Sequence, residues 1–126
     1  MAAIYSVSAG GFVQDPRRYV FQVAGELEIP SGLTLPYQFC KKSATLSSAR
    51  MTFTTAGTST YNVLVESTNA NGGGLQTIIN TVVTPLSGQA VSLSITNPAL
   101  AANHILRVTI TQNTGTPSTD VTLVLE

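Results

Sequence analysis

The chain contains few charged residues, one histidine, one cysteine and no tryptophan. Each scarcity narrows the range of functions that the chain can have. Only 10% of the 126 residues are Asp, Glu, Lys or Arg, whereas an average soluble domain has about 25%. Six basic residues balance six acidic ones, so the formal net charge is zero. Because nucleic acids are bound mainly through clustered Lys and Arg, this composition argues against a nucleic-acid partner.

The scarcity of cysteine and of long apolar runs excludes two further classes of protein. A single Cys40 cannot form an intrachain disulfide, so the chain is not a disulfide scaffold. No apolar run is long enough to cross a bilayer, and the first residues lack the pattern of a secretory signal. We therefore expect no membrane partner, and we expect synthesis in the cytoplasm.

What the chain has in quantity is alternation of apolar and polar residues, with 18 Thr and 12 Ser among the polar ones. Val121, Leu123 and Leu125 form one such row. A period of two is typical of strands that are buried on one face. Turn residues separate the rows and predict strands at residues 20–29, 33–40, 45–54, 60–66, 75–83, 90–96, 104–112 and 120–126.

These strands predict a single all-β domain at residues 20–126, preceded by an N-terminal arm at residues 1–19. About eight strands with short and long connections favour a two-sheet antiparallel β-sandwich, and jelly-roll topology is our first expectation. Pro36 cannot donate to a strand ladder, so the strand at residues 33–40 should lie at a sheet edge or contain a bulge. The predicted core consists of Phe21, Val23, Leu27, Leu35, Tyr37, Phe39, Met51, Phe53, Tyr61, Val63, Val65, Ile78, Val91, Leu93, Ile95, Leu106, Val108, Ile110, Val121, Leu123 and Leu125.

Residues 1–19 fall outside the rhythm of the strands. Gly10 and Gly11 interrupt this segment, and a polar cluster with Arg17 and Arg18 ends it. Its apolar residues are too many to leave in water, so the arm either adds a strand to its own sheet or docks on a neighbouring molecule. Deletion of residues 1–18 is expected to leave a folded sandwich that attaches more weakly to its partner.

Titratable residues that could act as a catalytic set are few. Cys40 and His104 form the only conceivable pair of thiol nucleophile and base, and no acidic or amide residue stands beside either as an orienter. Glu26 and Glu28 are two residues apart and should share the solvent face of a strand. Two carboxylates can act as acid and base on a sugar, but charged edges that discourage stray sheet pairing are the simpler interpretation. We expect no enzyme activity.

Neither a metal site nor a cofactor site is indicated. Asp15, Glu66, Asp120 and Glu126 are scattered, so no compact cage for calcium is expected. Gly72–Gly74 are followed by a strand, and not by the helix with Lys and Ser or Thr that phosphate loops require. The catalytic, cofactor and metal residues expected from the sequence are therefore none.

The residues that remain for binding a partner lie in or beside the arm. Aromatic and Arg side chains supply buried area and directed hydrogen bonds at interfaces. The candidate partner-binding residues are Tyr5, Phe12, Arg17, Arg18 and Tyr19. The pair Lys41–Lys42 is the only other charge cluster, and we interpret it as a solvated turn.

The C-terminal third resembles a known type of virion protein. The segments Val91–Ile95, Leu100–Gln112 and Asp120–Leu125 are separated by short loops. This pattern resembles a β-sandwich common in capsid decoration proteins and tail-fibre modules of tailed bacteriophages. In that type, Ala-Gly-Asp often precedes the penultimate strand, and Asn103–His104 stands there in this chain.

The resemblance implies a structural, non-enzymatic virion protein. It favours a capsid decoration (cement) protein on the capsid surface, which binds the major capsid protein and other copies of itself. The alternative is a receptor- or carbohydrate-binding module of a phage tail fibre, with a glycan as its ligand. A small hydrolase built on Cys40 and His104 is the remaining alternative.

Overall fold

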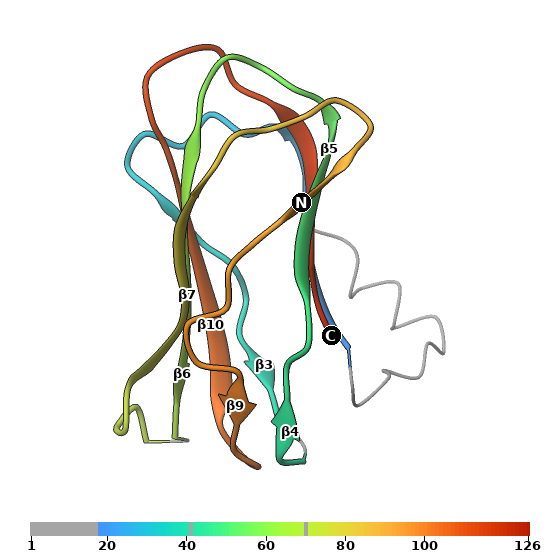
Figure 1. The fold of residues 1–126 in the computed structure, drawn as a ribbon. Helices are drawn as coiled ribbons and strands as arrows, with labels where there is room; N and C mark the ends of the chain where they lie inside the picture. Colours follow the sequence, from blue (N-terminus) through green and yellow to red (C-terminus); the bar gives the residue numbers. More distant parts are fainter. Residues whose placement is uncertain (1–17, 41, 70) are drawn as a thin grey trace, which may run out of the picture.

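The computed structural model describes residues 18–40, 42–69 and 71–126, and within these ranges it contains strands and loops without any helix (Figure 1). The strands are β1 (Tyr19–Glu26), β2 (Leu33–Thr34), β3 (Gln38–Phe39), β4 (Ala44–Thr45), β5 (Ala49–Thr55), β6 (Tyr61–Thr68), β7 (Gln76–Val83), β8 (Ala90–Ser92), β9 (Ala99–Leu100), β10 (Ile105–Gln112) and β11 (Thr119–Leu125). The all-β fold class predicted from alternation is confirmed.

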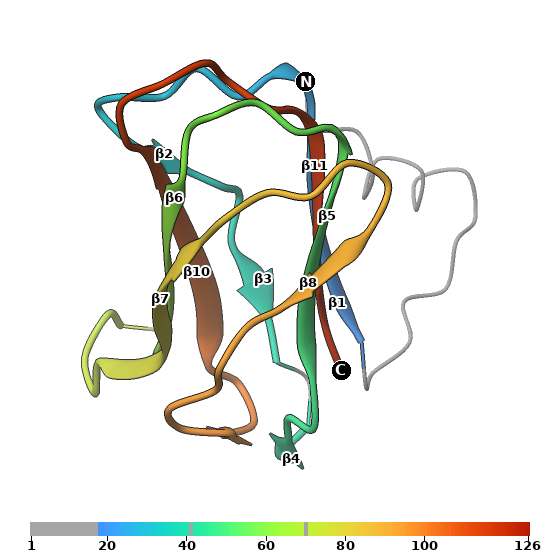
Figure 2. The ribbon, with the colours of Figure 1, turned by 45° about the horizontal axis from the view of Figure 1, so that its top comes forward.

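Two antiparallel sheets face one another and form the two layers of a sandwich (Figure 2). The first sheet has the order β1-β11-β5-β8, and the second has the order β2-β10-β6-β7. Strand β3 also pairs with β10 and continues the edge that β2 begins. Strands β4 and β9 form a separate two-stranded sheet that closes one end of the sandwich.

The strand pairs are nested within one another along the chain. Strand β1 pairs with β11, β2 and β3 pair with β10, β4 with β9, β5 with β8, and β6 with β7. The chain is therefore one long antiparallel ribbon whose tip lies between β6 and β7. Successive long pairs fall alternately into the first and the second sheet, which is the wrapping of a jelly roll. The expected jelly-roll β-sandwich is confirmed.

The core lies between the two sheets and is filled by the inward-facing residues of both. The rings of Phe53 on β5 and Tyr61 on β6 stack with their centroids 6.0 Å apart, which joins the two layers. The predicted core residues that are buried are Phe21, Leu27, Leu35, Met51, Phe53, Tyr61, Val63, Val65, Ile78, Leu93, Leu106, Val108, Ile110, Val121, Leu123 and Leu125. Val23, Val91 and Ile95 are partly buried against this cluster.

The predicted strand at residues 33–40 is interrupted at Pro36, where it divides into β2 and β3. Thr34 lies opposite Thr109, and Gln38 lies opposite Leu106. Between these two pairs the edge strand advances by four residues, whereas β10 advances by only three. The extra residue is a bulge, and the segment forms a sheet edge, as Pro36 predicted.

Two predicted core residues lie beyond that bulge and are exposed. A one-residue slip moves every following side chain to the other face of a strand. The side chains of Tyr37 and Phe39 are consequently 56% and 59% exposed, and their assignment to the core is wrong.

The other predicted strands agree with the observed ones to within a few residues at their ends, with two exceptions. The predicted strand at residues 45–54 is divided into β4 and β5, and only Ala90–Ser92 of the predicted strand at residues 90–96 is paired as β8.

Candidate binding surface

The slip at Pro36 brings two aromatic rings to the outer face of the second sheet. Phe39 on β3 lies opposite Ile105 on β10, and Arg107 lies two residues further along β10. Arg107 in turn lies opposite Glu66 on β6. Tyr37 precedes β3 and its side chain hydrogen-bonds to Arg107, so Tyr37, Arg107 and Glu66 form a row across three neighbouring segments.

Arg107 is held within this row by hydrogen bonds. Its Nε and Nη2 atoms donate to Oε1 of Glu66 at 3.2 and 2.9 Å. The hydrogen bond to Glu66, followed by one to Tyr37, raises the pKa of Arg107. The side chain of Glu66 is only 12% exposed, whereas that of Arg107 is 35% exposed. The carboxylate therefore lies under the guanidinium and fixes its orientation.

We call Tyr37, Phe39, Glu66 and Arg107 the Tyr37 surface. It combines two exposed aromatic rings with an ion pair of zero net charge. Tyr and Arg are enriched among residues that dominate binding energy at protein interfaces, because each buries a large area while keeping directed polar groups. The arrangement can bind a partner through stacking and hydrogen bonds.

The sequence prediction missed this surface because alternation was extended through Pro36. The signal that could have found it is the proline itself, since a bulge at that point exchanges the two faces of the strand. Cys40, which is buried, shows that the inward positions after the slip are the even-numbered ones.

The partner-binding residues expected from the sequence have different outcomes. Tyr19 lies in β1 opposite Leu125 and is only 2% exposed, so its choice as a free aromatic is wrong. It packs in the core because β1 begins one residue earlier than the predicted strand, so its inward row begins at Tyr19 and not at Phe21. Tyr5, Phe12 and Arg17 lie outside the described residues, and so does the predicted arm as far as residue 17.

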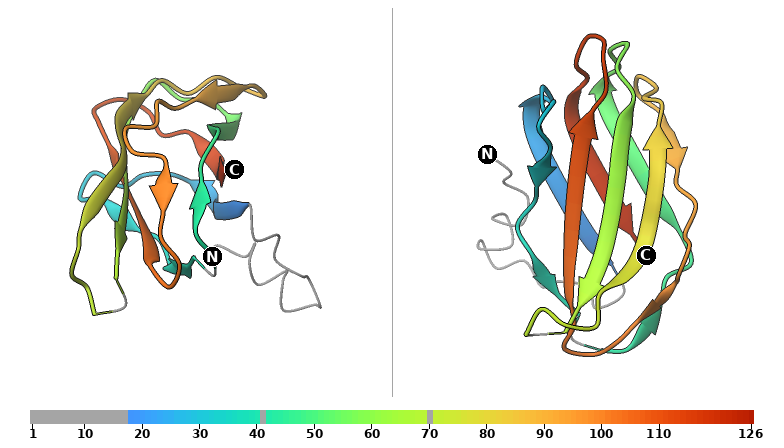
Figure 3. Two further views of the ribbon diagram at one scale, coloured as in Figure 1. Left: turned by 60° about the horizontal axis from the view of Figure 1, so that its bottom comes forward. Right: turned by 90° about the vertical axis from the view of Figure 1, so that its left-hand side faces the viewer.

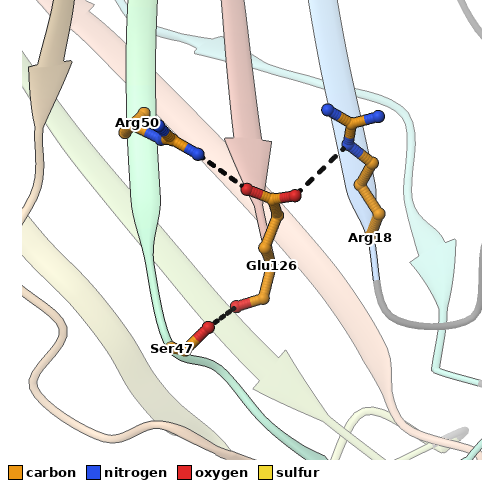
Figure 4. A network of polar contacts seen from close by, with 4 residues as sticks. All are labelled: Arg18, Ser47, Arg50 and Glu126. Carbon is orange, nitrogen blue, oxygen red and sulfur yellow. Dashed lines mark hydrogen bonds and ion pairs between the residues drawn. The ribbon is translucent and has the colours of Figure 1, made fainter.

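Arg18 takes part in a polar cluster at the end of β11 (Figure 4). Its Nε lies 3.7 Å from Oε2 of Glu126, while Nη2 of Arg50 donates to Oε1 of the same carboxylate at 2.8 Å. Both arginine side chains are 53% exposed. The Ser47 hydroxyl donates to the Glu126 carbonyl at 3.3 Å.

Beside this cluster lies an open hollow of about 540 Å³, lined by Ser47, Ser48, Ala49, Arg50, Ser92, Leu93 and Ile95. Arg18 and the Tyr37 surface belong to different sheets, since Arg18 directly precedes β1.

Cys40 and His104 are neighbours through their backbones. The Cys40 amide donates to the His104 carbonyl at 2.8 Å, and the Asn103 amide donates to the Cys40 carbonyl at 2.7 Å. The thiol itself hydrogen-bonds to the Tyr19 hydroxyl, and burial raises the pKa of Cys40. A nucleophilic cysteine requires a lowered pKa, so the environment of Cys40 opposes the hydrolase alternative.

Tyr19 responds to the same burial. Desolvation, with a smaller effect of Cys40, raises the pKa of Tyr19 to about 12.

The remaining candidates for chemistry are dispersed. Glu26 and Glu28 are exposed on either side of the buried Leu27, which confirms their place on the solvent face. Within residues 18–40, 42–69 and 71–126, no group of three acidic, His or Cys side chains is placed to hold a metal ion. The same residues include no helix long and apolar enough to cross a membrane.

Comparisons with known proteins give no family and no curated relative: no family model and no curated protein matches this chain. Among solved structures, the crystal structure of PirA is similar over 90% of this chain and 97% of its own, with 14% identity and a TM-score of 0.44. The CBM32 of AlyQ in complex with 4,5-unsaturated mannuronic acid is similar over 84% and 74%, with 13% identity and a TM-score of 0.44.

A structure of the infectious bursal disease virus Gt strain is similar over 86% of this chain, with 13% identity and a TM-score of 0.43. This chain spans 32% of that viral protein and 26% of a truncated AlyQ that contains CBM32 and alginate lyase domains. Each likeness is one of fold.

The nested strand order and the Tyr37 surface together define the class of this protein. It is a two-sheet jelly-roll β-sandwich, an architecture that viral capsid proteins and lectin domains share. Its exposed aromatic surface is suited to a structural or binding module.

Proposed function

We propose that this chain is a non-enzymatic structural protein of a tailed-bacteriophage virion, a capsid decoration protein that binds the major capsid protein and stabilises the shell. The observation that carries the proposal is the Tyr37 surface. It places Tyr37 and Phe39, both more than half exposed, beside an arginine whose orientation is fixed by Glu66. Such a surface can bury its two aromatic rings against a protein at a lower cost in side-chain entropy, because the arginine is already held in one orientation before binding.

The position of this surface also supports binding to a protein shell. Tyr37 and Phe39 lie at a sheet edge that is broken by a proline and a bulge. A broken edge resists pairing with stray strands, so its side chains rather than its backbone make the contacts. The surface carries no net charge, which allows contact with a shell of either sign at little electrostatic cost.

The sequence adds two supports. The C-terminal third resembles the β-sandwich of phage decoration proteins, and the low charge of the whole chain suits close packing with many copies on one particle. A decoration protein works by bridging subunits that are already adjacent, so many small interfaces add up to a large stabilisation of the shell.

Capsid binding is tested by adding the purified chain to capsids of the encoding phage that were assembled without it. We expect the chain to co-sediment with these capsids and to raise their resistance to heat. Replacing Tyr37 and Phe39 together with alanine should weaken binding by about 2 kcal/mol or more, because truncation of interface hot spots has that effect.

A matched control is Thr52→Ala, which changes an exposed residue on β5 of the first sheet. It should bind capsids as the unaltered chain does. Failure of the unaltered chain to co-sediment would overturn the proposal, and so would full binding by the double alanine variant.

A second candidate function is a carbohydrate-binding module of a tail fibre, and a specific observation favours it. Sugar sites combine aromatic platforms with a few fixed polar groups. Tyr37 and Phe39 are free aromatics of that kind, which the sequence had assigned to the core. Binding of the purified chain to a glycan array, lost in the Tyr37→Ala variant, together with no capsid binding, would select this function.

A further inference from the structure

The longest stretch of the sequence without a charged side chain runs from residue 67 to residue 106. It contains β7, which forms one edge of the second sheet, and β8, which forms one edge of the first. The right-hand view of Figure 3 faces the second sheet and shows β7 in yellow as the last strand on one side, with the orange segment that follows β8 running beside it. One side of the sandwich is therefore formed by two edge strands that carry no charge.

Natural sheets protect their edges with charges, prolines, bulges or short strands. The described sheet edges differ in this respect. The edge of β2 and β3 is broken at Pro36, β8 has three residues, and β1 is flanked by Arg18 and ends in Glu26 after a register shift. Strand β7 has eight residues, no proline and no charge. Its register shift against β6 falls at Ile78, so the segment Asn80–Val83 beyond it pairs with β6 without interruption.

The first part of the β7 edge is covered by the chain itself. Thr96 and Asn97 donate their amides to the carbonyl of Ile78 at 2.8 and 3.3 Å. In an antiparallel sheet, alternate backbone groups of an edge strand point away from its neighbour. Among the residues that the structure describes, none bonds to the outward groups of Asn80–Val83.

Exposed apolar side chains accompany this open edge. Val82 is 60% exposed within it, Leu75 precedes β7 with 57% exposure, and Leu86 follows β7 with 45% exposure. These are three of the five large apolar side chains exposed in the described part of the chain, and the other two are Tyr37 and Phe39.

We propose that the open edge of β7 at Asn80–Val83 pairs with the same edge of a second copy of this chain, in antiparallel orientation about a two-fold axis. An edge without charge can meet its own copy without bringing like charges together, and a self-complementary edge closes as a dimer. The antiparallel pairing joins the two second sheets into one and brings the Val82 side chains together on its outer face. This inference does not depend on capsid binding, because it concerns a different edge of the sheet from the Tyr37 surface.

The test is sedimentation of the full chain over a range of concentrations, combined with hydrogen exchange. The unaltered chain should form a dimer, and the amides of Asn80–Val83 should become more protected as the concentration rises. Val82→Lys should weaken the dimer by about tenfold or more, since two lysines would then face one another across the axis. Thr52→Lys, which adds the same charge to an exposed position on β5, should leave the dimer unchanged.

Several results would overturn the proposal. A chain that remains monomeric at all concentrations would do so, and so would a dimer that Val82→Lys leaves intact while it keeps its fold by circular dichroism. A dimer abolished by Phe12→Ser in the full chain, but not by Val82→Lys, would show that the N-terminal residues hold the two copies together. A dimer lost in Tyr37→Ala alone would place the contact at the opposite edge.

Discussion

Arg107 and Glu66 form an ion pair 2.9 Å long between β10 and β6, although they lie 41 positions apart along the chain. They are also the two charged residues that bound the uncharged stretch at residues 67–106. The charges at its two ends thus neutralise one another on the outer face of the second sheet, next to Tyr37.

This pair should show energetic coupling. We expect Glu66→Gln and Arg107→Gln each to lower the free energy of unfolding, and the double variant to lose less than their sum by about 0.5–1 kcal/mol. Urea denaturation of the four proteins measures this difference. Arg50→Gln combined with Glu66→Gln is the control and should be additive, because Arg50 pairs with Glu126. Full additivity of the Arg107 cycle would contradict the pairing.

The stability of the fold should also depend on the hydroxyl of Tyr61. It donates to the Leu27 carbonyl at 2.8 Å and accepts from the Ser118 amide at 2.9 Å, within the buried core. Tyr61→Phe leaves both backbone groups without this partner and should cost about 1–3 kcal/mol in urea denaturation. Tyr37→Phe removes the same atom from an exposed ring and should change stability by about 0.5 kcal/mol or less. Equal effects of the two substitutions would be inconsistent with this geometry.

Alkaline pH should destabilise the fold through Tyr19 and Cys40. The pKa of each is raised in the folded state, to about 12 for Tyr19, mainly because burial disfavours the charged form. In the unfolded chain the pKa is about 8.5 for Cys and about 10 for Tyr. The stabilisation is therefore complete below those values and is lost as pH rises through the folded pKa values.

The free energy of unfolding, measured against pH, should fall in this window. Tyr19→Phe should make the fall shallower between the pKa of a free tyrosine and the raised pKa of Tyr19. An identical slope in the variant would show that Tyr19 does not contribute.

The thiol of Cys40 should be unreactive in the folded protein. It is fully buried, and its raised pKa leaves little thiolate at neutral pH. Alkylation by iodoacetamide should be slower than that of a free cysteine, and it should reach the free rate in urea. Alkylation of the folded chain faster than a free thiol would revive the hydrolase alternative.

Gly57 should not tolerate a side chain. A Cβ at this position would meet the backbone carbonyls of Thr116 and Pro117 in the neighbouring loop, which cannot move aside as a flexible side chain can. Gly57→Ala should cost about 1–3 kcal/mol or more, as overpacking does. Gly73→Ala is the control, since its Cβ would meet only the side chain of Asn69. Thermal denaturation compares the two, and equal melting temperatures would contradict the close approach.

Much of this fold follows from local pattern. Alternation located the long strands, because one face of each is buried and the side chains of a strand have a period of two. It also identified the inward rows of β5, β6, β10 and β11, which lie in the middle of their sheets. It failed at Pro36, where the backbone inserts one residue and the pattern after the bulge refers to the other face.

The alternation pattern missed the candidate binding surface because this surface lies directly after Pro36. Tyr37 and Phe39 looked like core residues by spacing, while Tyr19 looked like part of an arm, and the structure exchanged these roles. The pairing of Arg107 with Glu66 and the contact of Tyr19 with Cys40 join strands that are distant in sequence. No local pattern contains such contacts.

The sequence by itself determined an all-β domain with a shared apolar core, because alternation and turn residues act over short distances. Only the tertiary structure decided which aromatics reach the surface and which strands are left at the edges. The exposed aromatics and the edge strands depend on how the antiparallel ribbon folds over itself. That folding fixes the strand order through contacts between residues that are far apart along the chain.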